Sequence, residues 1–200
     1  MRLNKFLAKS GLGSRRECDL YIQKGYISVN GNIVNDFSYQ VEDIDHVKFK
    51  KKTINIIDED YVYILNKPLN YICSAKDELN RKKVLDLFPG DIRLFTIGRL
   101  DYKTTGAILL TNNGDLADSI LRPNRKIERV YYAETPSKLN KENIKNIKKG
   151  LKIKNNILKA VINFKTKIKN NYIWSIVLYE GKYREIHRIF EFFNIKVLKL

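Results

Sequence analysis

The chain has 200 residues with 44% hydrophobic content, which supports a packed core and excludes a wholly disordered polypeptide. Its 38 Lys and Arg residues exceed its 22 Asp and Glu residues, so the net charge of +16 favours a polyanionic partner, nucleic acid before an anionic membrane. No apolar run approaches the ~20 residues that span a bilayer, and we expect neither a membrane span nor a secretory signal.

Charge alone does not establish binding, because a coding bias towards Lys, Asn and Ile would also raise the number of surface lysines. The two cysteines, Cys18 and Cys73, lack metal-ligand spacing and have no second pair. We therefore expect reduced thiols, a cytoplasmic location and no bound metal.

Two short helices are predicted at the start of the chain. Apolar residues at helical spacing indicate the first, namely Leu3, Phe6 and Leu7. Glycines at 11 and 13 end it, and Ser14 with Glu17 forms a capping box that begins the second. The second helix directs Cys18, Tyr21 and Ile22 inward and ends at Gly25.

A β-hairpin is predicted next, because Asn30-Gly31 lies between two alternating apolar segments. A basic run at 48–52, expected to be an exposed strand edge and linker, is followed by the acidic cluster Asp58–Asp60. We place a domain boundary there, giving domains 1–58 and 59–200.

The second domain alternates strand-like and helical segments. Strands are predicted at 61–65, 95–97, 107–111, 130–134, 157–164 and 172–178, and helices at 83–88, 115–121, 139–149 and 184–193. Strands outnumber helices and sequence neighbours can pair antiparallel, so we predict an α+β domain around a mixed, largely antiparallel sheet.

The most informative motif is Gly98-Arg99-Leu100-Asp101, followed by Thr105-Gly106, an apolar run and the polar segment 111–115. A carboxylate there can serve as a nucleophile or general base without a cofactor. It can equally be a structural ion paired with an arginine, and Asp101 alone leaves both alternatives open.

The wider block, G-R-L-D-x-x-T-x-G-x-x-x-L-T-N-x-G-D-L-A, resembles the catalytic motif of pseudouridine synthases. The similarity is to the ribosomal class with an N-terminal alpha-L RNA-binding domain of small-ribosomal-protein type. Four further segments resemble motifs of that family: 65–68, 80–87, 128–131 and 180–190.

The resemblance implies a small RNA-binding domain followed by a catalytic domain that isomerises uridine to pseudouridine in ribosomal RNA, with the large subunit favoured. It implies Asp101 as the essential aspartate, Tyr131 stacked on the target base, and Arg99 beside a flipped nucleotide. It implies no organic cofactor and a monomeric enzyme. The expected RNA contacts are Arg15, Arg16, Lys67, Arg99, Arg129, Arg184 and Arg188.

The chain departs from the family pattern at three places. His187 stands where relatives carry an Arg or Lys that pairs with the catalytic aspartate. Either His187 is charged by its proximity to Asp101, or Arg188 substitutes, or activity is weaker, and we favour pairing of His187 with Asp101. Asn70 replaces a usual glycine, so we expect a looser turn there, and relatives continue past Leu200 into a further stretch.

Two other functions stay open at this stage. A non-catalytic RNA-binding or ribosome-assembly protein could keep the same fold. Only the intact block around Asp101 separates this alternative from an enzyme in the sequence. A DNA-binding protein is less well supported, since the sequence has no clear recognition helix, zinc-ligand set or basic heptads.

Overall fold

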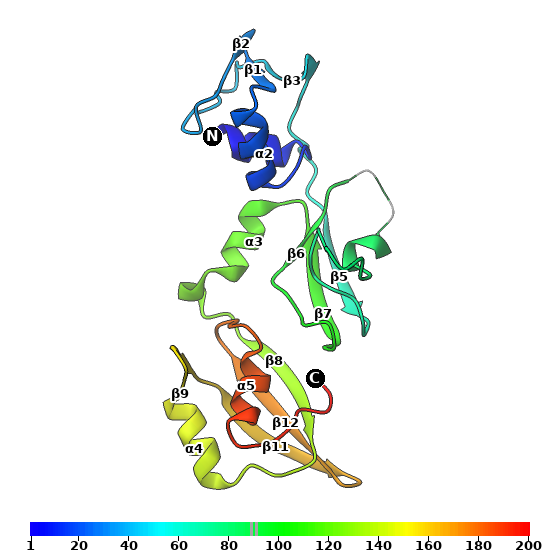
Figure 1. The fold of residues 1–200 in the computed structure, drawn as a ribbon, viewed down its shortest axis with the longest axis vertical. Helices are drawn as coiled ribbons and strands as arrows, with labels where there is room; N and C mark the ends of the chain where they lie inside the picture. Colours follow the sequence, from blue (N-terminus) through cyan, green and yellow to red (C-terminus); the bar gives the residue numbers. More distant parts are fainter. Residues whose placement is uncertain (89, 91) are drawn as a thin grey trace. The chain divides into compact units, whose positions relative to one another are not determined.

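The computed structural model describes residues 1–88, 90 and 92–200, which form two compact units. The first unit contains Met1–Tyr63, Pro89–Phe95 and Leu110–Asp115, and the second contains Ile64–Phe88, Thr96–Leu109 and Leu116–Leu200. Figure 1 labels most of the helices and strands. Among the described residues, no helix is long and apolar enough to cross a membrane.

The beginning of the chain folds as two helices beside a small sheet. The helices are α1 (Leu3–Lys9) and α2 (Arg15–Gln23), and the strands are β1 (Ile27–Val29), β2 (Asn32–Ile33), β3 (Val47–Phe49) and β4 (Lys52–Thr53). The sheet has the order β2-β1-β3-β4, with antiparallel pairs throughout. Its core includes Leu3, Leu7, Cys18, Ile22, Ile27 and Val47, each at most 1% exposed.

The predicted local signals are confirmed in this region. The Ser14 side chain accepts a hydrogen bond from the Glu17 backbone N–H, and Glu17 Oε2 accepts one from the Ser14 N–H at 2.8 Å, forming the capping box. Asn30 and Gly31 have φ values of 52° and 86°, the left-handed conformations that a two-residue hairpin turn requires. The basic run is also a hairpin, with β3 and β4 on either side of Lys50 and Lys51.

The rest of the chain carries the larger number of elements. Its strands are β5 (Val62–Lys67), β6 (Phe95–Ile97), β7 (Gly106–Thr111), β8 (Arg129–Thr135), β9 (Leu151–Ile153), β10 (Asn156–Leu158), β11 (Val161–Ile168) and β12 (Asn171–Leu178). Its helices are α3 (Gly114–Leu121), α4 (Lys141–Lys149) and α5 (Glu185–Glu191), with 3-10 turns η1 (Val84–Leu87) and η2 (Pro123–Arg125). The sheets have the orders β5-β7-β6, β11-β12-β8 and β10-β9.

Two predicted elements differ from the structure. The helix predicted at 83–88 is the short 3-10 turn η1. The single strand predicted at 157–164 is two strands, because β10 pairs with β9 whereas β11 pairs with β12. The residues between them, 159 and 160, belong to neither strand.

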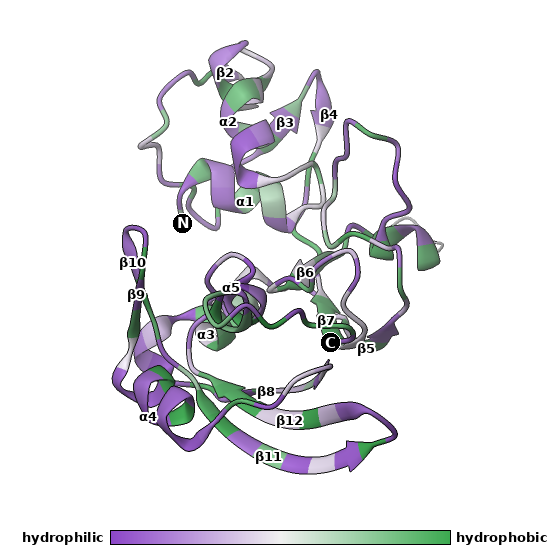
Figure 2. Cartoon of the chain, turned by 60° about the horizontal axis from the view of Figure 1, so that its bottom comes forward, coloured by the Kyte–Doolittle hydropathy of each residue, from purple (hydrophilic) through white to green (hydrophobic). Residues whose placement is uncertain are grey.

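The largest hydrophobic core lies between the β11-β12-β8 sheet and the helices α4 and α5. Trp174 on β12 is fully buried, and its indole N–H donates a 2.8 Å hydrogen bond to Thr135 Oγ1 on β8. Helix α4, mostly purple in Figure 2, buries Ile147 and partly buries Ile144 in this core while its other side chains are polar. Helix α5 contributes Ile186, Ile189 and Phe190 and thereby fixes the position of His187.

Candidate active site

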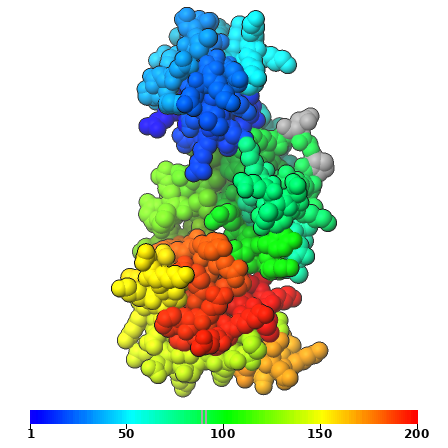
Figure 3. All heavy atoms as spheres, in the orientation of Figure 1, coloured from blue at the N-terminus to red at the C-terminus, as the bar shows by residue number. Residues whose placement is uncertain are grey.

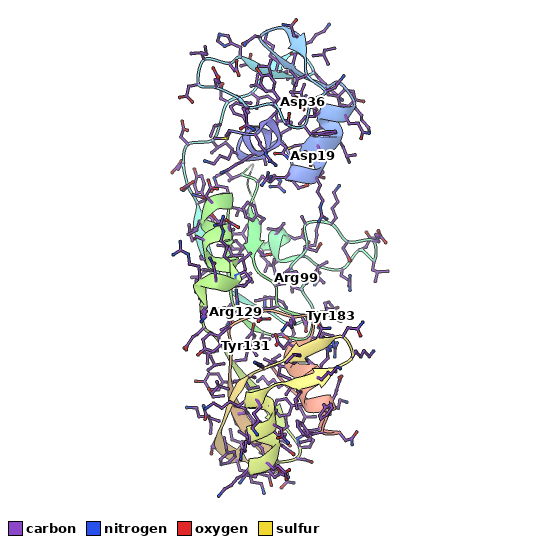
Figure 4. All side chains as sticks on the ribbon, turned by 90° about the vertical axis from the view of Figure 1, so that its left-hand side faces the viewer. Asp19, Asp36, Arg99, Arg129, Tyr131 and Tyr183 are labelled. Carbon is purple, nitrogen blue, oxygen red and sulfur yellow. The ribbon has the colours of Figure 1, made fainter. Side chains whose placement is uncertain are left out.

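A pocket of about 660 Å³ lies within the second unit. It is lined by residues from seven places in the chain: 72–74, Arg81, 98–102 with Thr104, Leu121 with Pro123, Arg129 with Tyr131, 178–187 and Leu200. Asp101, Tyr131 and His187, the three residues predicted to carry catalysis, all line this one pocket. Figure 4 labels four of the lining residues, Arg99, Arg129, Tyr131 and Tyr183, which lie near one another in that view.

The loop that carries Asp101 is a tight turn. Gly98 has a φ of 79°, a conformation that a side chain strongly disfavours. The Thr104 N–H donates a 3.0 Å hydrogen bond to the Asp101 carbonyl. The Asp101 side chain is 38% exposed, so its carboxylate is open to a substrate entering the pocket.

Residues 70–73, which follow β5, hold this loop through three hydrogen bonds. The Asn70 N–H donates to the Tyr102 carbonyl at 2.9 Å, and Lys103 Nζ donates to Asn70 Oδ1 at 3.0 Å. The Leu100 N–H donates to Cys73 Sγ at 3.4 Å. The looser turn expected at Asn70 is therefore not found, because Asn70 adopts a φ of 65° and its side chain adds a contact to the loop that carries Asp101.

Tyr131 lies on β8, opposite Ile176 of β12. Its ring is half-buried, and burial raises the pKa of its hydroxyl, while the nearby Arg129 opposes the increase. The hydroxyl therefore stays protonated near neutral pH and presents an apolar face with a polar end to the pocket.

His187 lies on α5 with its side chain 16% exposed and its Nδ1 atom 4.0 Å from Asp101 Oδ2. This distance is longer than a hydrogen bond. Among the described residues, no hydrogen-bond partner is found for the buried Nδ1 atom. Burial lowers the pKa of His187, with Arg184 adding to the effect and Asp101 and Glu191 opposing it, so the neutral imidazole predominates at pH 7.

Arg188 does not take the place of a cation beside Asp101. Its guanidinium donates to the Ile153 carbonyl at 3.2 Å and to the Tyr183 carbonyl at 3.5 Å, and it does not line the pocket. Arg184, which has a φ of 46° at the start of α5, does line the pocket, with Nη2 3.8 Å from a Glu191 oxygen.

The other predicted RNA contacts divide by exposure. Arg99 is exposed and Arg129 half-buried at the pocket wall, where Arg129 Nη1 donates to the Tyr179 carbonyl at 3.3 Å. Lys67 is 0% exposed and donates to the Pro68 carbonyl at 2.9 Å, so its ammonium is not presented to a phosphate. Burial lowers the pKa of Lys67, with Cys73 and Asp101 opposing.

Arg15 and Arg16 belong to the first unit, on the first turn of α2, and both are exposed. Arg15 Nη2 lies 3.3 Å from Asn4 Oδ1 in a surface hydrogen bond. The pocket lining also includes Cys73, which was not among the predicted site residues, and Thr104, which belongs to the quoted motif but was given no role. Thr104 is 2% exposed, and among the described residues no partner is found for its hydroxyl.

The described part of the chain contains no cluster of three or more His, Cys, Asp or Glu side chains that could hold a metal ion.

Comparison with known proteins gives the same two-part organisation. The S4 domain family matches residues 1–47, and the family described as RNA pseudouridylate synthase matches residues 61–192. An S4 domain followed by such a catalytic domain defines a class of RNA-modifying enzymes. The chain belongs to the RNA pseudouridylate synthase family, which confirms the predicted resemblance and the predicted fold class.

Similar proteins cover the whole chain. The ribosomal large subunit pseudouridine synthase B of Bacillus subtilis is 32% identical over 203 residues, which include 100% of this chain and 83% of that protein. An RNA pseudouridine synthase of Rickettsia bellii, described as uncharacterized, is 37% identical, with 100% of this chain and 87% of the relative covered. A crystal structure of a pseudouridylate synthase superimposes with a TM-score of 0.65 and 26% identity, covering 100% of this chain and 86% of that one.

Proposed function

We propose that the protein isomerises a specific uridine of ribosomal RNA, in the large subunit, to pseudouridine, with Asp101 as the essential residue. The observation that carries this proposal is the pocket in which an accessible Asp101 carboxylate faces Tyr131 and His187. The large-subunit assignment is supported by the Bacillus subtilis relative named for that activity.

The reaction breaks the bond between base and sugar, rotates the base and rejoins it through carbon. Atoms and electrons balance within the nucleotide, so the proposed chemistry uses no external oxidant, reductant or organic cofactor. Asp101 supplies the carboxylate that starts the reaction, and Tyr131 stacks on the base with its half-buried ring. The reacting bond is inaccessible in a stacked helix, so the uridine enters the pocket flipped out.

Phosphate contacts complete the proposed mode of binding. Arg99, Arg129 and Arg184 line the pocket and supply cations for the phosphates that flank the flipped nucleotide. Exposed Arg15 and Arg16 on α2 dock the first unit on structured RNA. The net charge of +16 supports binding that weakens steeply with salt.

The same proposal covers the location, the oligomeric state and the domain bounds of the enzyme. We infer a cytoplasmic monomer whose RNA-binding domain occupies 1–58 and whose catalytic domain occupies 59–200. The two matched families, at 1–47 and 61–192, support a boundary in the segment between them.

Pseudouridine mapping of ribosomal RNA tests the proposal. Cells that lack the protein are complemented with the wild-type chain or with Asp101→Asn. One site restored only by the wild-type chain is the expected result. A site that Asp101→Asn restores equally would refute the role of Asp101, and no change at any site would favour a non-catalytic RNA-binding protein.

A further inference from the structure

The lysines of this chain are unevenly distributed. Residues 138–169 contain eleven lysines, all exposed, and one acidic side chain, Glu142, which gives a net charge of +10 out of +16 for the whole chain. Residues 1–58, by contrast, contain ten basic and seven acidic side chains. A coding bias towards lysine would raise the lysine content everywhere, but it would not remove acidic residues from one segment. The charge of this segment therefore has a cause of its own.

The fold accounts for the lysines of β11. In the sheet order β11-β12-β8, β11 is an edge strand, and Lys165, Lys167 and Lys169 are exposed on it. Lysines on an edge strand prevent pairing with the strand of another chain. These three side chains therefore do not by themselves indicate a ligand.

The lysines of α4 form a second group. Lys141, Lys145 and Lys148 lie within about 60° of one another around the helix axis, since successive residues are about 100° apart. We call these three residues the lysine stripe. All three are exposed, whereas the core-facing side of α4 is formed by Ile144 and Ile147.

The lysine stripe does not favour the helix that carries it. Lys145 is four residues after Lys141 and three before Lys148, and like charges at these spacings destabilise a helix. Lys141 is also the first residue of α4, where the helix dipole disfavours a cation. Among the described residues, no carboxylate forms a salt bridge with any of the three. Such a repulsive cluster indicates an anionic ligand from outside the chain.

A basic surface connects the lysine stripe to the catalytic pocket within the second unit. The β9–β10 hairpin follows α4 directly and carries the exposed Lys152 and Lys154. Lys182, which lines the pocket, donates from Nζ to the Ile157 carbonyl on β10 at 2.8 Å. Figure 3 shows the yellow atoms of the hairpin beside the orange-red atoms of the segment that contains Lys182. Positive charge therefore extends from the rim of the pocket to α4.

We propose that the lysine stripe binds the phosphate backbone of an RNA helix that flanks the uridine in the pocket. The inference deepens the proposed function and rests on it for the identity of the ligand. Phosphate contacts of this kind position an RNA without reading its sequence. A membrane does not fit this surface, because a helix that lies on a bilayer needs an exposed apolar face. The exposed residues of α4 are all polar: Lys141, Glu142, Lys145, Asn146, Lys148 and Lys149.

The test measures equilibrium binding of the full chain to a short RNA duplex of arbitrary sequence at several salt concentrations. The stripe variant combines Lys141→Gln, Lys145→Gln and Lys148→Gln, because glutamine removes the charge and keeps a similar helix propensity. Each neutralised phosphate contributes about 0.7–0.9 to the slope of log affinity against log salt concentration. The slope is therefore expected to decrease by about 2–3, with roughly a tenfold or greater loss of affinity at low salt.

The matched control combines Lys165→Gln, Lys167→Gln and Lys169→Gln, which remove the same three charges from the edge strand β11. The control is expected to change the slope by less than half as much as the stripe variant. Equal changes in both variants would show that only net charge matters and would overturn the proposal, as would an unchanged slope in the stripe variant. A stripe variant that binds RNA normally but loses binding to vesicles of phosphatidylcholine and phosphatidylserine would assign the surface to a membrane instead.

Two further measurements separate binding from folding and from catalysis. Removing like charges from α4 is expected to leave the thermal unfolding midpoint of the stripe variant equal to that of wild type or higher, and a markedly lower midpoint would refute the argument from repulsion. Single-turnover pseudouridine formation at saturating enzyme is expected to be unchanged, because the stripe does not line the pocket. A wild-type chain that binds the duplex but makes no pseudouridine would refute the proposed function, whereas the comparison of the two variants would still decide the role of the stripe.

Discussion

Replacing His187 by arginine tests how the Asp101 carboxylate is supported. At pH 7 the buried imidazole is mainly neutral, whereas an arginine carries a permanent charge. We expect His187→Arg to be at least as active as wild type, and His187→Ala to lose most activity because the imidazole whose Nδ1 lies 4.0 Å from the carboxylate is then removed.

The expected gain in rate follows from the 4.0 Å distance between His187 Nδ1 and Asp101 Oδ2. Two unit charges 4.0 Å apart attract by about 4 kcal/mol at an effective dielectric constant of ~20 and by about 1 kcal/mol in water. Asp101 is 38% exposed, so solvent screening brings the effect towards the lower value. A gain of about 1–2 kcal/mol in the arginine variant corresponds to roughly a 5- to 30-fold faster reaction, if all of it is retained in the transition state.

The assay is single-turnover pseudouridine formation on a ribosomal RNA fragment between pH 5.5 and 8.5. Below its pKa, His187 becomes a cation itself, so the advantage of His187→Arg over wild type should shrink as the pH falls. Arg184 and Glu191 also act on the pKa of His187 and are kept in every variant. A difference in rate between variants therefore reports on position 187. An alanine variant as active as wild type at all pH values would refute the pairing of His187 with Asp101.

Four further outcomes are expected. Arg15→Glu with Arg16→Glu should weaken binding of ribosomal RNA fragments and reduce its salt dependence while leaving single-turnover chemistry at saturating enzyme intact; normal binding would contradict the docking role. Gly98→Ala places a side chain at a φ of 79° and should cost about 1–2 kcal/mol while slowing the reaction, as chemical denaturation and kinetics will show. Trp174→Phe removes a buried hydrogen bond to Thr135 and part of the core, so unfolding free energy should fall by about 2–3 kcal/mol; a loss below ~0.5 kcal/mol would argue against this core. The pKa of His187 is lower in the folded state, so the unfolded state binds that proton more readily: its contribution to stability is complete above pH ~6.5 and declines as the pH falls, a slope that His187→Gln should reduce in urea unfolding.

Local signals in this sequence predict local structure well. The capping box of Ser14 and Glu17 and the turn at Asn30-Gly31 each depend on residues within three positions of one another, and both form as expected. The prediction of a single strand at 157–164 was wrong. The break in this segment depends on the partner with which each half pairs, β9 or β12. Partner choice is a property of the folded sheet, and no local pattern encodes it.

The candidate site shows the same contrast between local signals and long-range packing. The motif around Asp101 predicted a loop that lines the pocket, but the residues that hold this loop, Asn70 and Cys73, lie about 30 residues earlier in the chain. The resemblance of 65–68 to a family motif placed Lys67 among the RNA contacts. Its burial follows from the packing after β5, which only the folded structure reveals.

His187 and Arg188 show why adjacent residues cannot exchange roles in a helix. Successive residues on a helix point about 100° apart, so when one faces the pocket the next points elsewhere. On α5, His187 faces Asp101, and Arg188 reaches the carbonyls of Ile153 and Tyr183 instead. For Arg188 to replace the missing cation, α5 would have to turn and withdraw Ile186, Ile189 and Phe190 from the core. Burying one such side chain is worth about 1.5–3 kcal/mol, which exceeds what a screened ion pair at Asp101 returns, so the packing of α5 keeps Arg188 away from Asp101.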